Sequence, residues 1–305
     1  MIASALFKKQ LELLAFDHPT RTMTACVNQG QVKFPCHACE DICPEGVYTG
    51  GMGENADFSG CINCGLCVSA CPSRCIAPSA LHASKLLRVL NLAEEQVILS
   101  EQEEGEAHLR VASLAALPWE YLALLAMKKQ VVLLLGQERP EEAALLRENL
   151  ARLMVFFGKE SWKERFVLAA SAKKIPPPPM DRRGLFKMAG QELKGRAAPM
   201  TVGEDGVDGR LLRTLLHREM AGTPEKYGFP GPAIGEDCTG CGVCHVLCPQ
   251  KAIRVRKTER GFDLILAPLG CNACGLCEKI CIQGAISGFS VVGLQDLTPV
   301  RIFSR

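Results

Sequence analysis

Short apolar runs and helical patterns alternate through the middle of the chain. Gln130–Gly136 is a continuous apolar run that ends at glycine, as a buried strand does. Pro140–Phe157 carries glutamates in its first turn and then leucines, Met154 and Phe157 along one side, which predicts an amphipathic helix. The other expected elements are a helix over Pro118–Lys128 and strands within Glu95–Ser100, Ala107–Ala112 and Arg165–Ala170. Strands alternating with helices predict a small α/β layer with a mostly parallel sheet.

The segments on either side of this region have different sequence patterns. An apolar helical face over the first residues ends at Pro19, and Pro176–Pro179 is a stiff polyproline stretch followed by helical pieces at Gly184–Leu193 and Leu211–Met220. Gly- and Pro-rich sequence then runs from Gly222 to Gly235. We therefore divide the chain into a helical arm (1–20), a first cysteine-rich domain (21–80), a cysteine-free α/β domain (81–175), a linker (176–235), a second cysteine-rich domain (236–290) and a tail (291–305).

Composition narrows the class of protein. The formal net charge of the 305 residues is only +2 and aromatic residues make up 6%, which gives no support to nucleic-acid binding. The longest apolar stretch, Val111–Met127, contains Pro118 and Glu120 and is too short to span a bilayer, so no transmembrane segment is expected. Lys8 and Lys9 follow the first apolar residues, which is not the order of a signal peptide, and we expect a cytoplasmic protein. A twin-arginine pair at Arg182 lies mid-chain with no apolar stretch after it and is interpreted as the start of an amphipathic helix.

The chain contains seventeen cysteines, an unusually high number, and most of them occur in repeated runs. Residues 238–249 read Cys-x2-Cys-x2-Cys-x3-Cys-Pro, and residues 271–281 repeat the spacing with Ile282 in place of the proline. Two such runs in tandem resemble bacterial ferredoxins that carry two [4Fe-4S] clusters. The resemblance implies a ferredoxin fold with a hairpin between the runs, for which Ile253–Arg256 and Phe262–Leu266 are the candidate strands.

The resemblance also implies how the thiols are shared. The first three cysteines of a run surround one cluster, and the fourth leads away and reaches the neighbouring cluster. The expected ligand sets of the second domain are Cys238, Cys241, Cys244 and Cys281 for one cluster, and Cys271, Cys274, Cys277 and Cys248 for the other.

The first domain contains one complete run and one incomplete run. Residues 61–72 follow the full pattern, whereas the upstream run lacks its first cysteine, because Lys33 stands at that position. Cys26 is the best substitute, through a longer loop. The expected sets are Cys26, Cys36, Cys39 and Cys71 for one cluster, and Cys61, Cys64, Cys67 and Cys43 for the other.

Cys75 is the remaining cysteine and the alternative sixteenth ligand. It occupies the slot that Val47, Ala252 and Ala285 hold after the other runs, where a small buried apolar residue fits, and free cysteine behaves as one. Without Cys26, the first cluster would be a [3Fe-4S] form or take another donor such as His37.

The order of elements in the middle region resembles the small delta subunit of methyl-viologen-reducing hydrogenases. That family binds a [2Fe-2S] cluster through cysteines after the glycine-ended strand, but here residues 136–140 read Gly-Gln-Glu-Arg-Pro, without a thiol. We expect a spacer or docking module, because the region also lacks a Gly-rich phosphate loop and any nucleophile motif.

Together these patterns predict an α+β protein in which two ferredoxin-like two-cluster domains flank a small α/β domain with a parallel sheet. The expected function is electron transfer through four [4Fe-4S] clusters, as a polyferredoxin subunit without a catalytic site of its own. The resemblance implies partners such as subunits of a hydrogenase, a formate dehydrogenase, a heterodisulfide-reductase-like enzyme or an aldehyde oxidoreductase of anaerobic metabolism. Two alternatives stay open: a flavin-type cofactor site in the middle domain, and an iron–sulfur scaffold protein.

Overall fold

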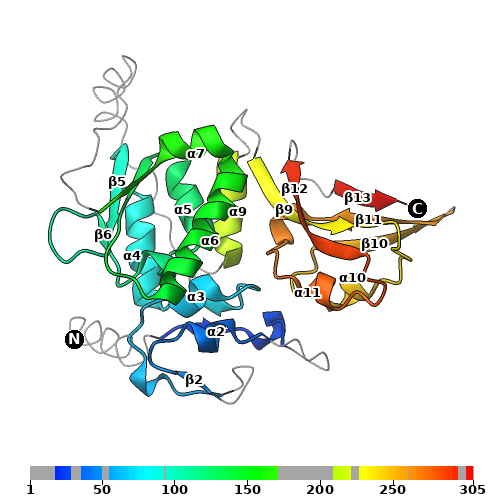
Figure 1. Ribbon diagram of the computed structural model, residues 1–305, viewed down its shortest axis with the longest axis horizontal. Coiled ribbons are helices and arrows are strands. Elements are labelled where there is room, and N and C mark those ends of the chain that lie inside the picture. The colour runs from blue at the N-terminus through cyan, green and yellow to red at the C-terminus, as the bar shows by residue number, and fades with distance from the viewer. Residues whose placement is uncertain are drawn as a thin grey trace, which may run out of the picture.

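The computed structural model describes residues 18–28, 36–49, 55–92, 94–170, 209–220, 227–259, 261–294 and 300–304. Figure 1 shows a larger body formed by the N-terminal and middle parts of the chain, and a smaller body formed by the C-terminal part. The expected helix at Gly184–Leu193 and nearly all of the expected arm over residues 1–20 lie outside the described residues.

A four-stranded parallel sheet lies in the larger body, as the apolar runs predicted. Its strand order is β6-β5-β7-β8, and every neighbouring pair is parallel. The strands are β5 (Gln96–Ser100), β6 (Leu109–Arg110), β7 (Gln130–Leu134) and β8 (Phe166–Ala169). The expected strand over Ala107–Ala112 is therefore reduced to two residues. Leu99 and Leu133 pair in the centre of the sheet and are fully buried, which explains why β7 reads as an uninterrupted apolar run.

The helices beside this sheet supply most of the core. They are α4 (Ala80–Leu90), α5 (Trp119–Ala126), α6 (Pro140–Phe157), α7 (Lys159–Arg165) and α9 (Gly209–Met220). The bounds of α6 match the sequence prediction, because Pro140 suits a first helical turn and Gly158, with φ of 78°, ends the helix. All eight residues of α5 are buried, so this helix runs through the centre of the larger body. The hydrophobic pattern did not predict α4 or α7.

The first cysteine-rich segment packs directly on this core (Figure 1). Its elements are β1 (Thr20–Arg21), α2 (Ala38–Asp41), β2 (Tyr48–Thr49), β3 (Asn55–Ala56), α3 (Leu66–Ala70) and β4 (Ile76–Ala77). β1 pairs with β4 and β2 with β3, both antiparallel. One continuous buried cluster joins Cys71 and Ile76 to Leu122 and Leu133, so the hydrophobic core crosses the boundary that the sequence suggested near residue 80.

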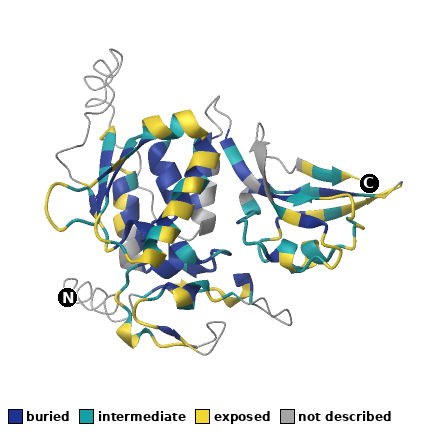
Figure 2. Cartoon of the chain, viewed as in Figure 1, coloured by how far each residue is buried: buried dark blue, intermediate teal, exposed yellow. Residues whose placement is uncertain are grey.

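The smaller body contains the second cysteine-rich segment. The helices and strands of this part are β9 (Tyr227–Ile234), α10 (Val243–Leu247), β10 (Ile253–Thr258), β11 (Gly261–Leu266), α11 (Leu276–Lys279), β12 (Ile286–Leu294) and β13 (Val300–Ser304). The expected hairpin is present as the antiparallel pair β10–β11. The tail expected after residue 290 instead completes β12 and forms β13, which pairs with β11. Figure 2 shows that this body has fewer fully buried residues than the larger one.

β9 joins the two bodies and corrects the expectation of a plain linker at this point. Its backbone pairs with β12 of the smaller body, and Gly235 N–H donates to Ala285 O at 2.7 Å. Its aromatic side chains enter the larger body, where Tyr227 stacks on Phe156 and Phe229 contacts Trp119. Aromatic residues contribute large buried areas, so β9 fixes the smaller body against α5 and α6. α9, expected as part of the same linker, packs on α5 and buries Leu216.

None of the described helices combines the length and the apolar character that crossing a bilayer requires.

Candidate iron–sulfur centres

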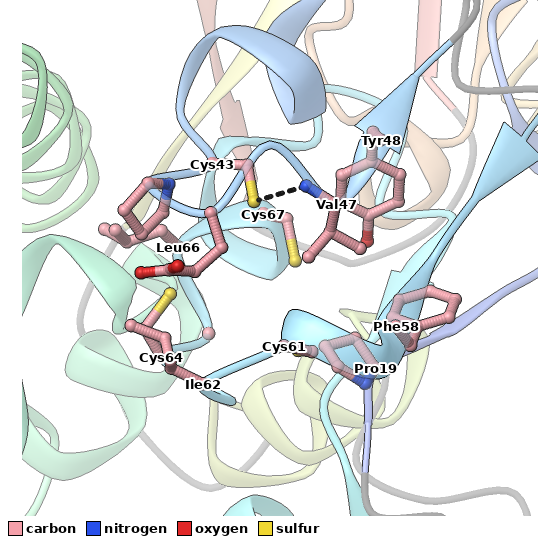
Figure 3. Close-up of a pocket in the computed structure, with 13 residues that line it drawn as sticks. Pro19, Cys43, Val47, Tyr48, Phe58, Cys61, Ile62, Cys64, Leu66 and Cys67 are labelled. Atoms are coloured by element: carbon pink, nitrogen blue, oxygen red, sulfur yellow. Dashed lines mark hydrogen bonds between the residues drawn. The ribbon is translucent and has the colours of Figure 1, made fainter.

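Four cavities among the described residues are each lined by one of the four predicted cysteine quartets. They enclose between about 280 and 400 Å³, including space open to solvent. We name them by their thiols: cavity A has Cys26, Cys36, Cys39 and Cys71; cavity B has Cys43, Cys61, Cys64 and Cys67; cavity C has Cys238, Cys241, Cys244 and Cys281; and cavity D has Cys248, Cys271, Cys274 and Cys277. Figure 3 shows cavity B with its cysteines around the space.

Four short helices explain why each run contributes to two cavities. The cysteine at or near the start of a helix and the cysteine four residues later lie one helical turn apart. In α3, Cys67 lines cavity B and Cys71 lines cavity A; in α10, Cys244 lines cavity C and Cys248 lines cavity D. The other two pairs are Cys39 and Cys43 beside α2, and Cys277 and Cys281 beside α11. Cys244 also reaches the wall of cavity D, so cavities C and D are immediate neighbours.

The loops before these helices need left-handed backbone. In each complete run the residue after the second cysteine has a positive φ of 76° to 81° and begins the helix, and glycine adopts this conformation at little cost. These residues are Gly65, Gly242 and Gly275. A second left-handed residue stands three positions after each run's last cysteine: Gly46, Arg74, Lys251 and Gly284. The incomplete run has no such glycine before α2, where His37 begins the helix.

Backbone N–H groups donate to cysteine sulfurs at equivalent positions. Val47 N–H lies 3.4 Å from Cys43 Sγ (Figure 3), Cys75 N–H lies 3.4 Å from Cys71 Sγ, and Ala252 N–H lies 3.3 Å from Cys248 Sγ. Such donors stabilise negative charge on sulfur. Four thiols surround each cavity, and cysteine thiolates are the ligands of [4Fe-4S] clusters. The residues present therefore fit a cluster bound by four thiolates.

Cavity A differs from the others in having a cation and a thiol that belongs to none of the four predicted quartets. Arg21 Nη2 donates to Cys26 Sγ at 3.1 Å, and Cys75 Sγ lies 3.5 Å from Cys71 Sγ. Hydrogen bonding from the Cys75 thiol, aided by Arg21, lowers the pKa of Cys26 to about 5. The same thiol, with Ser73, lowers the pKa of Cys71 to about 6. The pKa of Cys75 is raised because its proton is shared with these two sulfurs.

Burial acts in the opposite direction on other thiols, including Cys39 of cavity A, whose pKa it raises to about 11. It raises the pKa of Cys67 and Cys277 to about 12 and that of Cys274 to about 11. A buried thiol without a counter-charge stays protonated, so the thiolate form of these residues depends on a cationic partner such as iron.

The structure places both candidates for the sixteenth ligand in cavity A. Cys26 and Cys75 line it together. The slot of Cys75 is buried after every run, since Val47, Cys75, Ala252 and Ala285 are each at most 4% exposed, as the internal comparison predicted. His37, the other donor considered, is exposed and its Nδ1 lies 2.9 Å from Glu40 Oε2.

Several residues around cavity A were not identified from the sequence. Arg21 is a lone arginine five residues before Cys26, and nothing in the pattern marks it. Arg74 donates to Ser69 O at 2.5 Å and pairs with Glu120 of α5, so it fixes the turn after Cys71. A charged residue inside the otherwise apolar α5 was the one available signal, because a buried carboxylate needs a partner.

The loop after β7, where the hydrogenase delta subunits carry cysteines, is filled by a carboxylate. Gly136 N–H donates to Glu101 Oε2 at 2.6 Å, and the Glu101 side chain also accepts from Leu114 N–H. Burial, with a hydrogen bond to Glu101, raises the pKa of the neighbouring Glu138 to about 7. These contacts tie the ends of the strands together.

Comparison with known protein families identifies both cysteine-rich segments. Residues 237–285 match the 4Fe-4S dicluster domain family, and residues 56–77 match the 4Fe-4S binding domain family. No curated protein matches the chain. The two matches cover the runs around cavities C and D and the complete run of the first segment. The chain therefore contains two ferredoxin-type 4Fe-4S regions, which support iron–sulfur electron transfer.

Proposed function

We propose that the chain is a polyferredoxin with four [4Fe-4S] clusters, one in each of cavities A to D, and that it serves as an electron-transfer subunit of a cytoplasmic oxidoreductase complex. The observation that carries this proposal is that each cavity is lined by three thiols of one run and a fourth thiol from the partner run. In cavity A, Cys26 stands in for the missing first cysteine.

Each residue type has a defined task in this proposal. A [4Fe-4S] cluster bound by four thiolates supplies reversible one-electron transfer and leaves no site for a substrate. The cysteines hold the iron, and the N–H groups of Val47, Cys75 and Ala252 stabilise the charge on the sulfurs. Burial of Cys26, Cys39, Cys67 and Cys71 limits the access of water to those sulfurs.

The middle part then acts as a support. It is joined to cavity A through Arg74 and Glu120 and to the smaller body through Tyr227 and Phe229. A rigid frame keeps the distances between redox centres constant. Proposed partners are subunits of a hydrogenase, a formate dehydrogenase, a heterodisulfide-reductase-like enzyme or an aldehyde oxidoreductase, as the resemblance to polyferredoxins implies.

Anaerobically purified, full-length protein tests the proposal. Chemical analysis should give about sixteen irons and as much acid-labile sulfide per chain, the content of four cubanes. Stepwise reduction should take up one electron per cluster and reverse on oxidation. Colourless protein, bound zinc or disulfide-linked thiols would overturn it. Stoichiometric flavin would favour the cofactor-enzyme alternative, and rapid cluster transfer to an apo-protein would favour the scaffold alternative.

A further inference from the structure

One carbonyl oxygen of the first cysteine-rich segment is held by two amides of the second. Gln250 Nε2 donates to Ser73 O at 2.9 Å, and Asn272 Nδ2 donates to the same oxygen at 2.8 Å. Ser73 is 1% exposed and Asn272 is 5% exposed, whereas Gln250 is half-buried, so the carbonyl and the Asn272 amide are shielded from water. Two donors on one buried acceptor form a specific, desolvated connection between the two bodies.

The contact lies between two of the cavities. Ser73 lines cavity A, and both Gln250 and Asn272 line cavity D. Ser73 follows Cys71 by two residues and Gln250 follows Cys248 by two residues, so equivalent positions of two runs meet. Ser73 Oγ also lies 3.7 Å from Cys71 Sγ, which connects the carbonyl to a thiol of cavity A through a single residue. One hydrogen-bonded layer thus separates cavity A from cavity D.

Both sides of this layer are held in place. Arg74, next to Ser73, is fixed by its buried pair with Glu120. On the other side, β9 anchors the smaller body through Phe229, whose ring centroid lies 5.3 Å from that of Phe156. The Ser73 carbonyl and the two side-chain amides are therefore each held in position by packed parts of the structure.

Cavities B and C lie at the outer ends of the arrangement. Ile62, which lines cavity B, is 59% exposed, and Ile282, next to Cys281 of cavity C, is 83% exposed. Cys241 of cavity C is itself exposed. The two outer cavities are thus the ones with solvent-facing walls.

We propose that the Ser73 carbonyl and the Gln250 and Asn272 amides form the junction for electron transfer between the two ferredoxin regions, so that the clusters are ordered B–A–D–C. Electron tunnelling falls off exponentially with distance, and at the A–D wall residues that line cavities of the two bodies are directly hydrogen-bonded to each other. This inference rests on the proposed function, because it needs clusters in cavities A and D. The three residues are positioning residues: they set the distance and touch no substrate.

A double variant, Gln250→Leu with Asn272→Asp, tests the junction in the full-length holoprotein. It removes one donor and places a carboxylate opposite the Ser73 carbonyl without a change in size. The matched control is Gln283→Leu, because Gln283 has the same position after Cys281 as Gln250 has after Cys248 but is exposed. Iron content of about sixteen per chain in all forms shows that the clusters are loaded.

Magnetic interaction is the first measurement. Cys64→Ala with Cys241→Ala gives a background designed to lose the clusters of cavities B and C and to retain about eight irons. Electron paramagnetic resonance of the reduced background should show A and D as an interacting pair. The double variant should weaken this interaction, because the direct contact between the two cavity walls is lost, and Gln283→Leu should leave the interaction unchanged. Independent spins in a background with eight irons would overturn the junction while leaving the proposed function standing.

Hydrogen exchange is the second measurement, and it uses protein that retains all four clusters, without the Cys64→Ala and Cys241→Ala substitutions. Peptides that contain residues 71–75 and 248–252 should exchange about tenfold faster in the double variant, because two buried hydrogen bonds are lost. Gln283→Leu should leave both peptides unchanged. Unchanged exchange in the double variant, with iron content intact, would also overturn the proposal. An iron content far below sixteen in the unaltered protein would instead count against the proposed function.

Discussion

Arg74 and Glu120 form a buried, two-pronged ion pair that ties the turn after Cys71 to helix α5. Arg74 Nε and Nη2 each lie 3.2 Å from a different Glu120 oxygen, and the side chains are 5% and 0% exposed. Arg74 also donates to Ser69 O, so one guanidinium joins the end of α3 to the core of the larger body. The pair is thus the link between a cluster cavity and the parallel-sheet layer.

Removing one member of this pair should destabilise the protein strongly. Glu120→Leu leaves an unpaired buried cation, and we expect it to lower the free energy of unfolding by about 3–5 kcal/mol. Arg74→Met combined with Glu120→Leu should recover part of it, because no buried charge remains. The matched control is Glu148→Gln, which removes an exposed pair with Arg152 and should cost at most about 0.5 kcal/mol. Urea midpoints followed by far-ultraviolet circular dichroism measure these changes, and equal midpoints for Glu120→Leu and Glu148→Gln would contradict the prediction.

Arg21 should raise the reduction potential of the cluster proposed for cavity A. Its guanidinium lies 3.1 Å from Cys26 Sγ, and a nearby cation favours the reduced form, which carries one more negative charge. Arg21→Gln should therefore lower the potential of this cluster alone, as measured by a redox titration followed by paramagnetic resonance. Arg152→Gln, on the exposed face of α6, is the control and should shift none. A uniform shift of all four potentials would argue against a local effect.

Cys26 and Cys75 should differ in their effect on iron content. Cys75→Ala should leave about sixteen irons per chain, because alanine occupies the equivalent slot at residues 252 and 285. Cys26→Ala should lose iron or convert one cluster to a [3Fe-4S] form, which has a distinct paramagnetic signal when oxidised. The reverse outcome, with iron lost only in Cys75→Ala, would identify Cys75 as the ligand.

Phe229 should hold the two bodies together. Phe229→Ala removes a 1% exposed ring that contacts Trp119 and Phe156. The lost packing between the two bodies should lower the free energy of unfolding by about 3–5 kcal/mol. Small-angle scattering should show a longer particle with unchanged iron content. Phe303→Ala removes a ring that stacks on Phe262 within the smaller body, and it should leave the particle dimensions unchanged. Unaltered scattering in Phe229→Ala would rule out this role.

The sequence predicted local features well. The period of α6, with Pro140 at its start and Gly158 after its end, gave the bounds of that helix, and apolar runs located β5, β7 and β8. Helix α4 was missed, although its sequence has an amphipathic face. The strand β9 was missed because Pro230 and Pro232 made the segment read as a linker, whereas its edge position tolerates prolines that donate no hydrogen bond.

By itself the sequence, with the sharing of thiols that its resemblance to bacterial ferredoxins implies, predicted the quartets of cavities B, C and D, because a spacing of four residues places two cysteines one helical turn apart wherever the helix sits. For cavity A it left both Cys26 and Cys75 open. Tertiary structure alone decided that cavity A faces cavity D and that Arg74 meets Glu120. Those contacts join residues 46, 177 and 199 positions apart, as in Arg74–Glu120, Ser73–Gln250 and Ser73–Asn272. No local pattern encodes such pairs, since they depend on how the buried faces of α5, α6 and β9 pack against one another.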